Sequence, residues 1–216
     1  MSSIIEKTVA FVQQRLEGAE SGHDWFHTER VWKMACYIHR FEGGNKRIIE
    51  LAALLHDIAD PKFHDGDEQL ALKLSEDFLR SQDIAEEEIQ QILMIIKLMS
   101  FKNREEMPSD IPVELQIVQD ADRIDALGAI GIARTFNFGG YKNNKMYDPA
   151  VTPALNMDKE QYKKSEGTTI NHFYEKLLLL KDMMNTETAK KIAAERHVFM
   201  LRFLDRFYFE WHEGSQ

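Results

Sequence analysis

The stretch over residues 51–60 constrains the fold of this chain more than any other, because it joins a buried helix face to a polar end. Four large apolar residues follow the i, i+3, i+4, i+7 spacing of such a face: Leu51, Leu54, Leu55 and Ile58. Pro61 is a stop signal, and the pattern predicts a helix over residues 46–60. Its last turn carries His56 and Asp57. Unpaired polar groups in an apolar setting are costly, and a divalent metal is an economical reason to hold an imidazole and a carboxylate there.

The His-Asp dipeptide alone is a weak signal, because it also arises by chance. The chain contains three copies: His23-Asp24, His56-Asp57 and His64-Asp65. An isolated copy is more often a surface pair, or a charge at a helix end, than part of a site. The apolar helix that precedes residues 56–57, together with two further stretches, distinguishes that copy from the others.

Composition indicates a helical globular protein. Hydrophobic residues make up 44% of the 216 and charged residues 29%, and only 5 prolines and 11 glycines leave little room for many turns. The net charge of −9 argues against binding of DNA or RNA through a broad basic surface, whereas a small nucleotide needs only a local cluster of cations. No apolar run approaches the length of a membrane span.

Two features bear on the cellular compartment. The single cysteine, Cys36, excludes an internal disulfide and favours the cytosol. The first residues lack the basic and apolar regions of a signal peptide. We therefore expect a cytoplasmic protein that does not associate with membranes.

Hydrophobic periodicity predicts an all-α chain. The expected helices cover residues 3–17, 21–42, 46–60, 67–81, 84–101, 113–136, 168–184 and 187–212. The last helix carries an i+4 aromatic ladder that indicates either core packing or a homodimer interface: Phe199, Phe203, Phe207 and Trp211. The sequence has no internal repeat and no evident domain boundary.

The least regular segment, residues 137–167, is too long for an ordinary turn. Long loops in compact domains are often functional lids. The segment is locally basic in an acidic chain, through Lys142, Lys145, Lys163 and Lys164. A lid over an anionic substrate and a solvated loop are both consistent with this composition.

Two other stretches carry candidate site residues. His23 and His27 are four residues apart and share a side of their expected helix. Taken alone, His27 fits a core histidine, and His23 fits a capping or solvent-exposed one. Asp122 lies beside the apolar stripe of its helix, among small residues, with Asp125 one turn on. By itself it fits a salt-bridged, partly buried carboxylate.

Together these stretches supply two imidazoles and two carboxylates from separate helices: His27, His56, Asp57 and Asp122. Long and uneven spacing is normal for a site assembled across a helical bundle. A mixed set of nitrogen and oxygen donors suits Mn²⁺, Fe²⁺, Co²⁺, Ni²⁺ or Zn²⁺ better than it suits a cysteine-rich structural zinc site. Metal-bound water can ionise near neutral pH and attack phosphorus, while the cation offsets charge in the transition state.

These residues resemble the signature of the HD superfamily of metal-dependent phosphohydrolases: an isolated His, an adjacent His-Asp pair and a distant Asp. The signature falls on His27, on His56-Asp57 and on Asp122, and the likeness covers roughly residues 20–130. Residues 171–177, Asn-His-Phe-Tyr-Glu-Lys-Leu, also look like small bacterial HD proteins related to nucleotide pyrophosphohydrolases. The resemblance implies one HD-type helical bundle over residues 1–216, with its core at about 20–130, helices over 168–212 packed on it and a lid-like loop around 137–167.

Departures from particular branches of the superfamily narrow this expectation. The bimetallic branches add two histidines between the His-Asp pair and the last Asp, whereas here only His64 lies in that interval, so we expect one metal. The Gly-Tyr-Pro signature of cyclic-dinucleotide phosphodiesterases is absent, and the only similar run is Gly140-Tyr141-Lys142.

The resemblance implies hydrolysis of a phosphate ester or anhydride in a small substrate such as a nucleotide, for example a (d)NTP. Asp60, one turn beyond His56, is the candidate to orient or deprotonate water, and it equally fits a cap for the following loop. Lys62, His64 and Lys102 are candidate phosphate contacts, with a solvated surface role as the alternative. Two other functions stay open: a non-catalytic nucleotide-sensing module that keeps the site residues, and an oxygenase that needs two irons.

Overall fold

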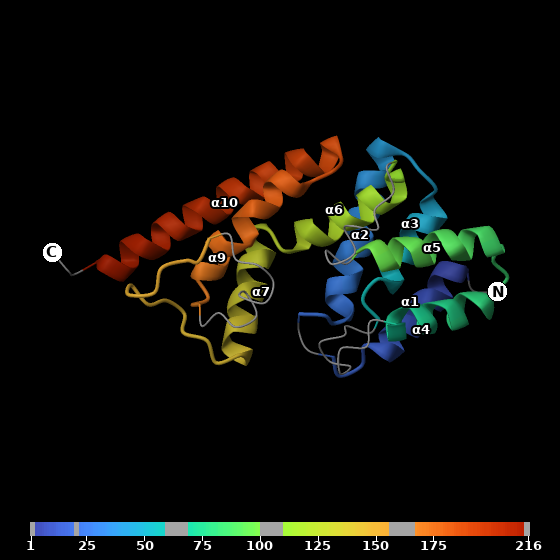
Figure 1. Cartoon of the computed structure of the whole chain (residues 1–216), viewed down its shortest axis with the longest axis horizontal. Coiled ribbons are helices and arrows are strands. Elements are labelled where there is room, and N and C mark those ends of the chain that lie inside the picture. Colours follow the sequence, from blue (N-terminus) through green and yellow to red (C-terminus); the bar gives the residue numbers. More distant parts are fainter. Residues whose placement is uncertain (1–2, 20–21, 59–68, 100–109, 156–166, 214–216) are drawn as a thin grey trace. The chain divides into compact units, whose positions relative to one another are not determined.

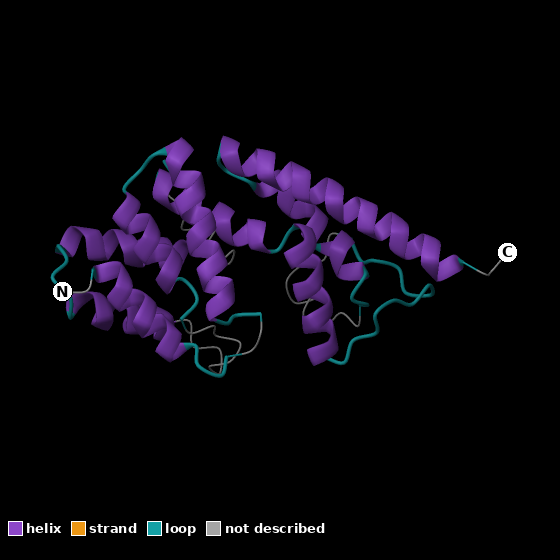
Figure 2. Ribbon diagram, turned by 180° about the vertical axis from the view of Figure 1, so that it is seen from behind, coloured by secondary structure: helices purple, strands orange, loops and turns teal. Residues whose placement is uncertain are grey.

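The computed structural model describes residues 3–19, 22–58, 69–99, 110–155 and 167–213. Within these ranges every regular element is a helix, which confirms the all-α prediction (Figures 1 and 2). None of the helices described is both long and apolar enough to cross a membrane. The chain divides into two compact units, Met1–Asp122 and Arg123–Gln216. That residues 1–216 form one HD-type domain stays a prediction.

The first unit is built around α3 (Lys46–Leu55), which packs on α1 (Ile4–Arg15), α2 (Trp25–Glu42) and α5 (Glu86–Met99) (Figure 1). The predicted apolar face is fully buried, and so are the alanines between its members: Leu51, Ala52, Ala53, Leu54 and Leu55. A helix that is apolar on every side belongs in a core. The polar residues that follow α3 are therefore held at the end of a rigid central element.

Two more helices complete this unit. α4 (Gln69–Arg80) packs against α5, and α6 (Val113–Asp125) follows the second undescribed segment. The turn between α2 and α3 is fixed against the start of α6. The Asn45 N–H donates to Glu114 Oε1 at 2.8 Å, and a Cβ on Gly44, which has a φ of +87°, would lie 2.9 Å from Val113 Cγ1. This turn locks the beginning of α3 to the beginning of α6.

The second unit contains α7 (Gly128–Tyr141), α9 (Asn171–Glu175), the 3₁₀ helix η3 (Leu177–Met183) and α10 (Glu187–His212). α10 packs on α7 and on η3. Phe203 and Phe207 of the aromatic ladder on α10 are half-buried and meet the rings of Phe136, Tyr147 and Phe173. Phe199 and Trp211 are exposed, at 49% and 44%, although the Trp211 ring also meets that of Tyr147.

Four predicted boundaries are wrong. The helix expected over 46–60 ends at Leu55, and His56 is its cap residue. The helix expected over 113–136 is two helices, α6 and α7, because the chain turns sharply before Gly128, whose φ is +73°. α7 continues to residue 141, into the segment expected to be irregular. The helix expected over 168–184 is a short α-helix followed by a 3₁₀ helix.

Part of the expected irregular loop, residues 142–155, is described, and it is tied to the segment around α9. The N–H groups of Thr169 and Ile170 donate to the carbonyls of Lys145 and Met146 at 2.9 and 3.0 Å. Asn171 and Glu175 bond the loop backbone at residues 151 and 154. Asn171 and Glu175 of the 171–177 motif therefore anchor the loop over residues 142–155. Within the described residues Lys145 forms an ion pair with Asp148 at 2.8 Å, so a neighbouring carboxylate balances the charge of Lys145.

Candidate metal centre

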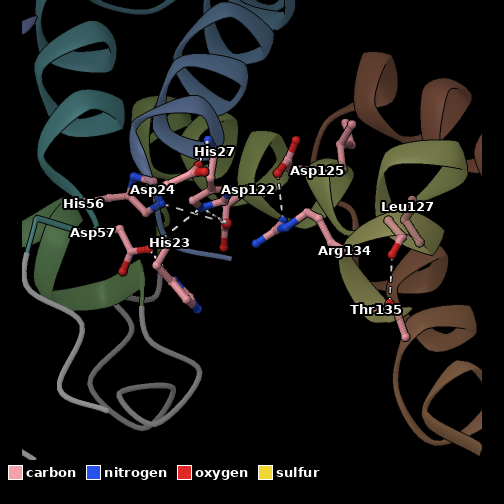
Figure 3. A network of polar contacts seen from close by, with 12 residues as sticks. His23, Asp24, His27, His56, Asp57, Asp122, Asp125, Leu127, Arg134 and Thr135 are labelled. Atoms are coloured by element: carbon pink, nitrogen blue, oxygen red, sulfur yellow. Dashed lines mark hydrogen bonds and ion pairs between the residues drawn. The ribbon is translucent and has the colours of Figure 1, made fainter. Parts of the chain in front are cut away.

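His27 is positioned by the N-terminus of α2. Asp24 is the N-cap residue, and its carboxylate accepts a hydrogen bond from the His27 N–H at 2.9 Å. Helix α2 therefore begins at Trp25, and the His27 ring is buried on its inner side, close to the ring of His56 (Figure 3).

His56 is positioned by the C-terminus of α3, where it is the cap residue. Its Nδ1 lies 2.9 Å from the Ala53 carbonyl oxygen. A carbonyl can only accept, so Nδ1 carries a proton, and in the neutral ring Nε2 keeps its lone pair. A ring nitrogen with this partner is the usual arrangement for a histidine that ligates a metal through its other nitrogen. The side chain is only 6% exposed, so this tautomer is held in a shielded place.

Asp122 comes from α6 and faces both histidines. Its Oδ1 lies 3.5 Å from His27 Nε2 and 3.9 Å from His56 Nε2. Donor atoms of these three residues all lie within 4.8 Å of one another, close enough to hold one metal ion. The Asp122 side chain is 41% exposed, whereas His27 is buried, so Asp122 is the solvent-accessible member of this group.

Asp57 joins the cluster next to the histidines. Its Oδ2 lies 3.8 Å from His27 Nε2 and 2.5 Å from Nδ1 of His23. Burial raises the pKa of Asp57, but the hydrogen bond from His23 and the positive potential of three histidines outweigh it and lower the pKa to about 2. The group is an ionised carboxylate at neutral pH.

The donor set fits a divalent transition metal. The predicted residues supply two imidazoles and two carboxylates in two close groups that share His27, and soft sulfur ligands are not among them: His27, His56, Asp57 and Asp122. Two carboxylates balance the charge of a divalent ion, which leaves the imidazoles neutral as ligation requires. That these four residues bind the metal remains a prediction, although the fold brings them together.

The other predicted site residues lie outside the described residues: Asp60, Lys62, His64 and Lys102. Asp125, one turn beyond Asp122, has a structural partner, because Arg134 donates to its carboxylate at 2.7 Å. The salt-bridged carboxylate that the sequence allowed at Asp122 is thus found at Asp125.

Sequence reasoning missed His23. It was expected to cap the helix or face solvent, yet it bonds a carboxylate of the cluster and with His27 and Asp57 forms a second close group of donors. The available signal was the four-residue spacing between the two histidines, which places both on one side of the chain.

The chain is similar to several known proteins. A family model described as the HD domain matches residues 25–127. YpgQ of Bacillus subtilis is 40% identical over 202 residues, which cover 92% of this chain and 89% of YpgQ. A crystal structure of an HD-superfamily hydrolase from Bacillus thuringiensis is 47% identical, covers 96% of both chains and has a TM-score of 0.77.

The crystal structure of Bacillus subtilis YpgQ in complex with ADP is also similar. It covers 95% of this chain and 94% of its own, with 35% identity and a TM-score of 0.75. These likenesses extend over almost the whole sequence, beyond the signature residues. The chain belongs to the HD-domain family.

Proposed function

We propose that this chain is a metal-dependent phosphohydrolase that acts on a nucleotide or a related small phosphate ester or anhydride. The observation that carries the proposal is the cluster at the ends of α2 and α3 and on α6, where two imidazoles and two carboxylates converge. A purely structural cluster gains nothing from an open side, whereas a hydrolytic centre needs one for its substrate. The exposure of Asp122 supplies it.

In this proposal His27, His56, Asp57 and Asp122 hold one divalent ion. When bound, such an ion polarises a phosphoryl oxygen and lowers the pKa of a nearby water, so that hydroxide forms near neutral pH. The protein supplies orientation. The bond from His56 Nδ1 to the Ala53 carbonyl keeps Nε2 directed at the centre, and the cap at Asp24 holds the first turn that carries His27.

We assign the remaining roles to residues that follow α3 and α5 in the sequence. Asp60 is proposed to orient or deprotonate the attacking water, one turn beyond His56. Lys62, His64 and Lys102 are proposed to offset phosphate charge. A triphosphate carries four negative charges. The metal ion cannot offset all of them, because its own charge is already balanced by two carboxylates.

A nucleotide is the favoured substrate for two reasons. The 35% identical YpgQ was crystallised in complex with ADP. In addition, a net charge of −9 disfavours long nucleic acids, which are bound through broad basic surfaces. A compact phosphate tail needs only local cations. We therefore propose a mononucleotide, with a phosphoanhydride as the bond cleaved.

The test is release of phosphate and pyrophosphate from dNTPs, NTPs, nucleoside monophosphates and guanosine tetraphosphate, with Mn²⁺, Co²⁺, Ni²⁺ or Mg²⁺. We expect metal-dependent release that is lost in Asp57→Ala, and the product names the bond. If the protein binds the metal and a nucleotide but releases no phosphate or pyrophosphate from any compound of the panel, the result would contradict hydrolysis and favour a nucleotide-sensing module.

A further inference from the structure

The segment just before α2 contributes twice to the candidate metal centre. Asp24 caps the helix and fixes the His27 backbone, and His23, its neighbour, reaches Asp57 across 34 residues of sequence. The His23 and His27 rings meet edge to face, with centroids 5.9 Å apart (Figure 3). A dipeptide outside the family signature is therefore part of the cluster.

The geometry between His23 and Asp57 is that of a hydrogen bond. Nδ1 and Oδ2 are 2.5 Å apart, which is shorter than the roughly 2.7–2.9 Å usual for a charge-assisted N–H···O bond. Two donors that share one ion, each about 2.1 Å from it, lie about 3 Å or more apart. A cation does not fit between these atoms, so a proton occupies the space. A nitrogen that carries this proton cannot ligate a metal at the same time.

We propose that His23 is a positioning residue, which donates Nδ1–H to Asp57 Oδ2 and thereby holds the Asp57 carboxylate beside His27, ready for the metal. This inference rests on the metal site of the proposed function and adds a residue to it. Carboxylate ligands in metal sites are themselves oriented by hydrogen bonds, and loss of such a partner typically weakens metal affinity about 10- to 100-fold. The rival assignment makes His23 a ligand of a second ion, shared with His27 and Asp57.

The test is a calorimetric titration of the metal-free full chain with Mn²⁺. Three variants separate the roles of the two ring nitrogens. His23→Leu removes the donor, His23→Asn places an amide nitrogen near the position of Nδ1, and His23→Gln places one near Nε2. His212→Gln, at an exposed histidine of α10, is the matched control. Melting temperatures in EDTA check that each variant folds.

We expect one Mn²⁺ per chain in the wild type. His23→Leu and His23→Gln should bind it about 10- to 100-fold more weakly. His23→Asn should recover most of the affinity, and His212→Gln should match the wild type. A structural role for the ring would not produce this difference between Asn and Gln.

Two results would overturn the inference alone: wild-type affinity in both His23→Leu and His23→Gln, or two ions in the wild type with one in His23→Leu. Wild-type affinity in His56→Ala and Asp57→Ala would instead overturn the metal site itself, and the inference with it. The two failures are thus distinguishable in one set of titrations.

Discussion

At the scale of single residues, the hydrogen bond between His56 and the Ala53 carbonyl determines which ring nitrogen is available to a metal. His56→Ala should therefore lose stoichiometric Mn²⁺ binding. The matched control is His39, whose Nδ1 makes the same kind of bond to the Gly43 carbonyl at 2.7 Å, but on the exposed end of α2. Titration with Mn²⁺ should find His39→Ala unchanged. If both variants lose Mn²⁺ binding equally, the loss results from disturbing the end of a helix and not from removing a metal ligand.

His172 gives a prediction for stability against pH. Burial, followed by the charge of Lys176, lowers the pKa of His172 from 6.5 to about 4. Between these values the unfolded chain binds the proton and the folded chain does not, so stability is full above about pH 6.5 and is lost as the pH falls towards 4. The loss from this group is on the order of 3 kcal/mol.

Urea unfolding of wild type and His172→Gln at pH 4.5 and 7.5 checks this prediction. The variant should lose less stability than the wild type over that interval. His212→Gln, at an exposed position, should behave like the wild type. If His172→Gln and the wild type lose the same free energy of unfolding, the buried neutral state of His172 is refuted.

At the scale of elements, the break between α6 and α7 depends on Gly128. Its φ of +73° is strained for any residue with a Cβ, and an added Cβ would lie 3.1 Å from Arg196 Cγ on α10. Gly18 is the matched control, because its φ is +78° and nothing lies within 4 Å of its Cβ position. Gly18→Ala should cost about 1 kcal/mol in the free energy of unfolding, and Gly128→Ala clearly more. If denaturant titrations find the same loss in free energy of unfolding for both variants, the Arg196 side chain moves aside without an energetic penalty.

The same break shows what the sequence can and cannot predict about helices. The core helix α3 was predictable because its apolar spacing and its flanking breakers agree, and burial of Leu51 and Leu54 confirms it. The boundary at Gly128 was not, because apolar periodicity runs through it and only the backbone dihedral reveals the turn. The anchoring of residues 142–155 by Asn171 and Glu175 was equally hidden, since it pairs side chains with backbone groups that carry no sequence signal.

The candidate site followed the same rule. His27, His56, Asp57 and Asp122 were predictable as a group because they match a known signature, and the fold brings them together. His23 was not, because its four-residue spacing from His27 places it on the same side of the chain but does not reveal its contact with Asp57. Site residues that belong to a known motif can be predicted from a sequence, whereas residues whose role depends on tertiary contacts cannot.

At the scale of the whole molecule, the metal ligands proposed here come from α2, α6 and the end of α3, so binding should couple to folding. Ligands that bind only the native state stabilise it by about 2.7 kcal/mol at 100 times the dissociation constant. For a chain of this size that corresponds to a rise of about 5–10 °C in melting temperature. Calorimetry with Mn²⁺ and then excess EDTA should show the rise and its reversal. Asp122→Ala should show neither, and a full rise in that variant would exclude Asp122 as a ligand.

The measurement that tests the central claim most directly determines bound metal and product release on the same samples. Metal-free protein is titrated with Mn²⁺, and nucleotide hydrolysis is followed at each occupancy in the wild type, His56→Ala and His39→Ala. We predict that turnover rises in proportion to bound metal in the wild type and His39→Ala, reaches its limit at one ion per chain, and is absent in His56→Ala. Turnover that persists in excess EDTA, or in His56→Ala without bound metal, would contradict the account.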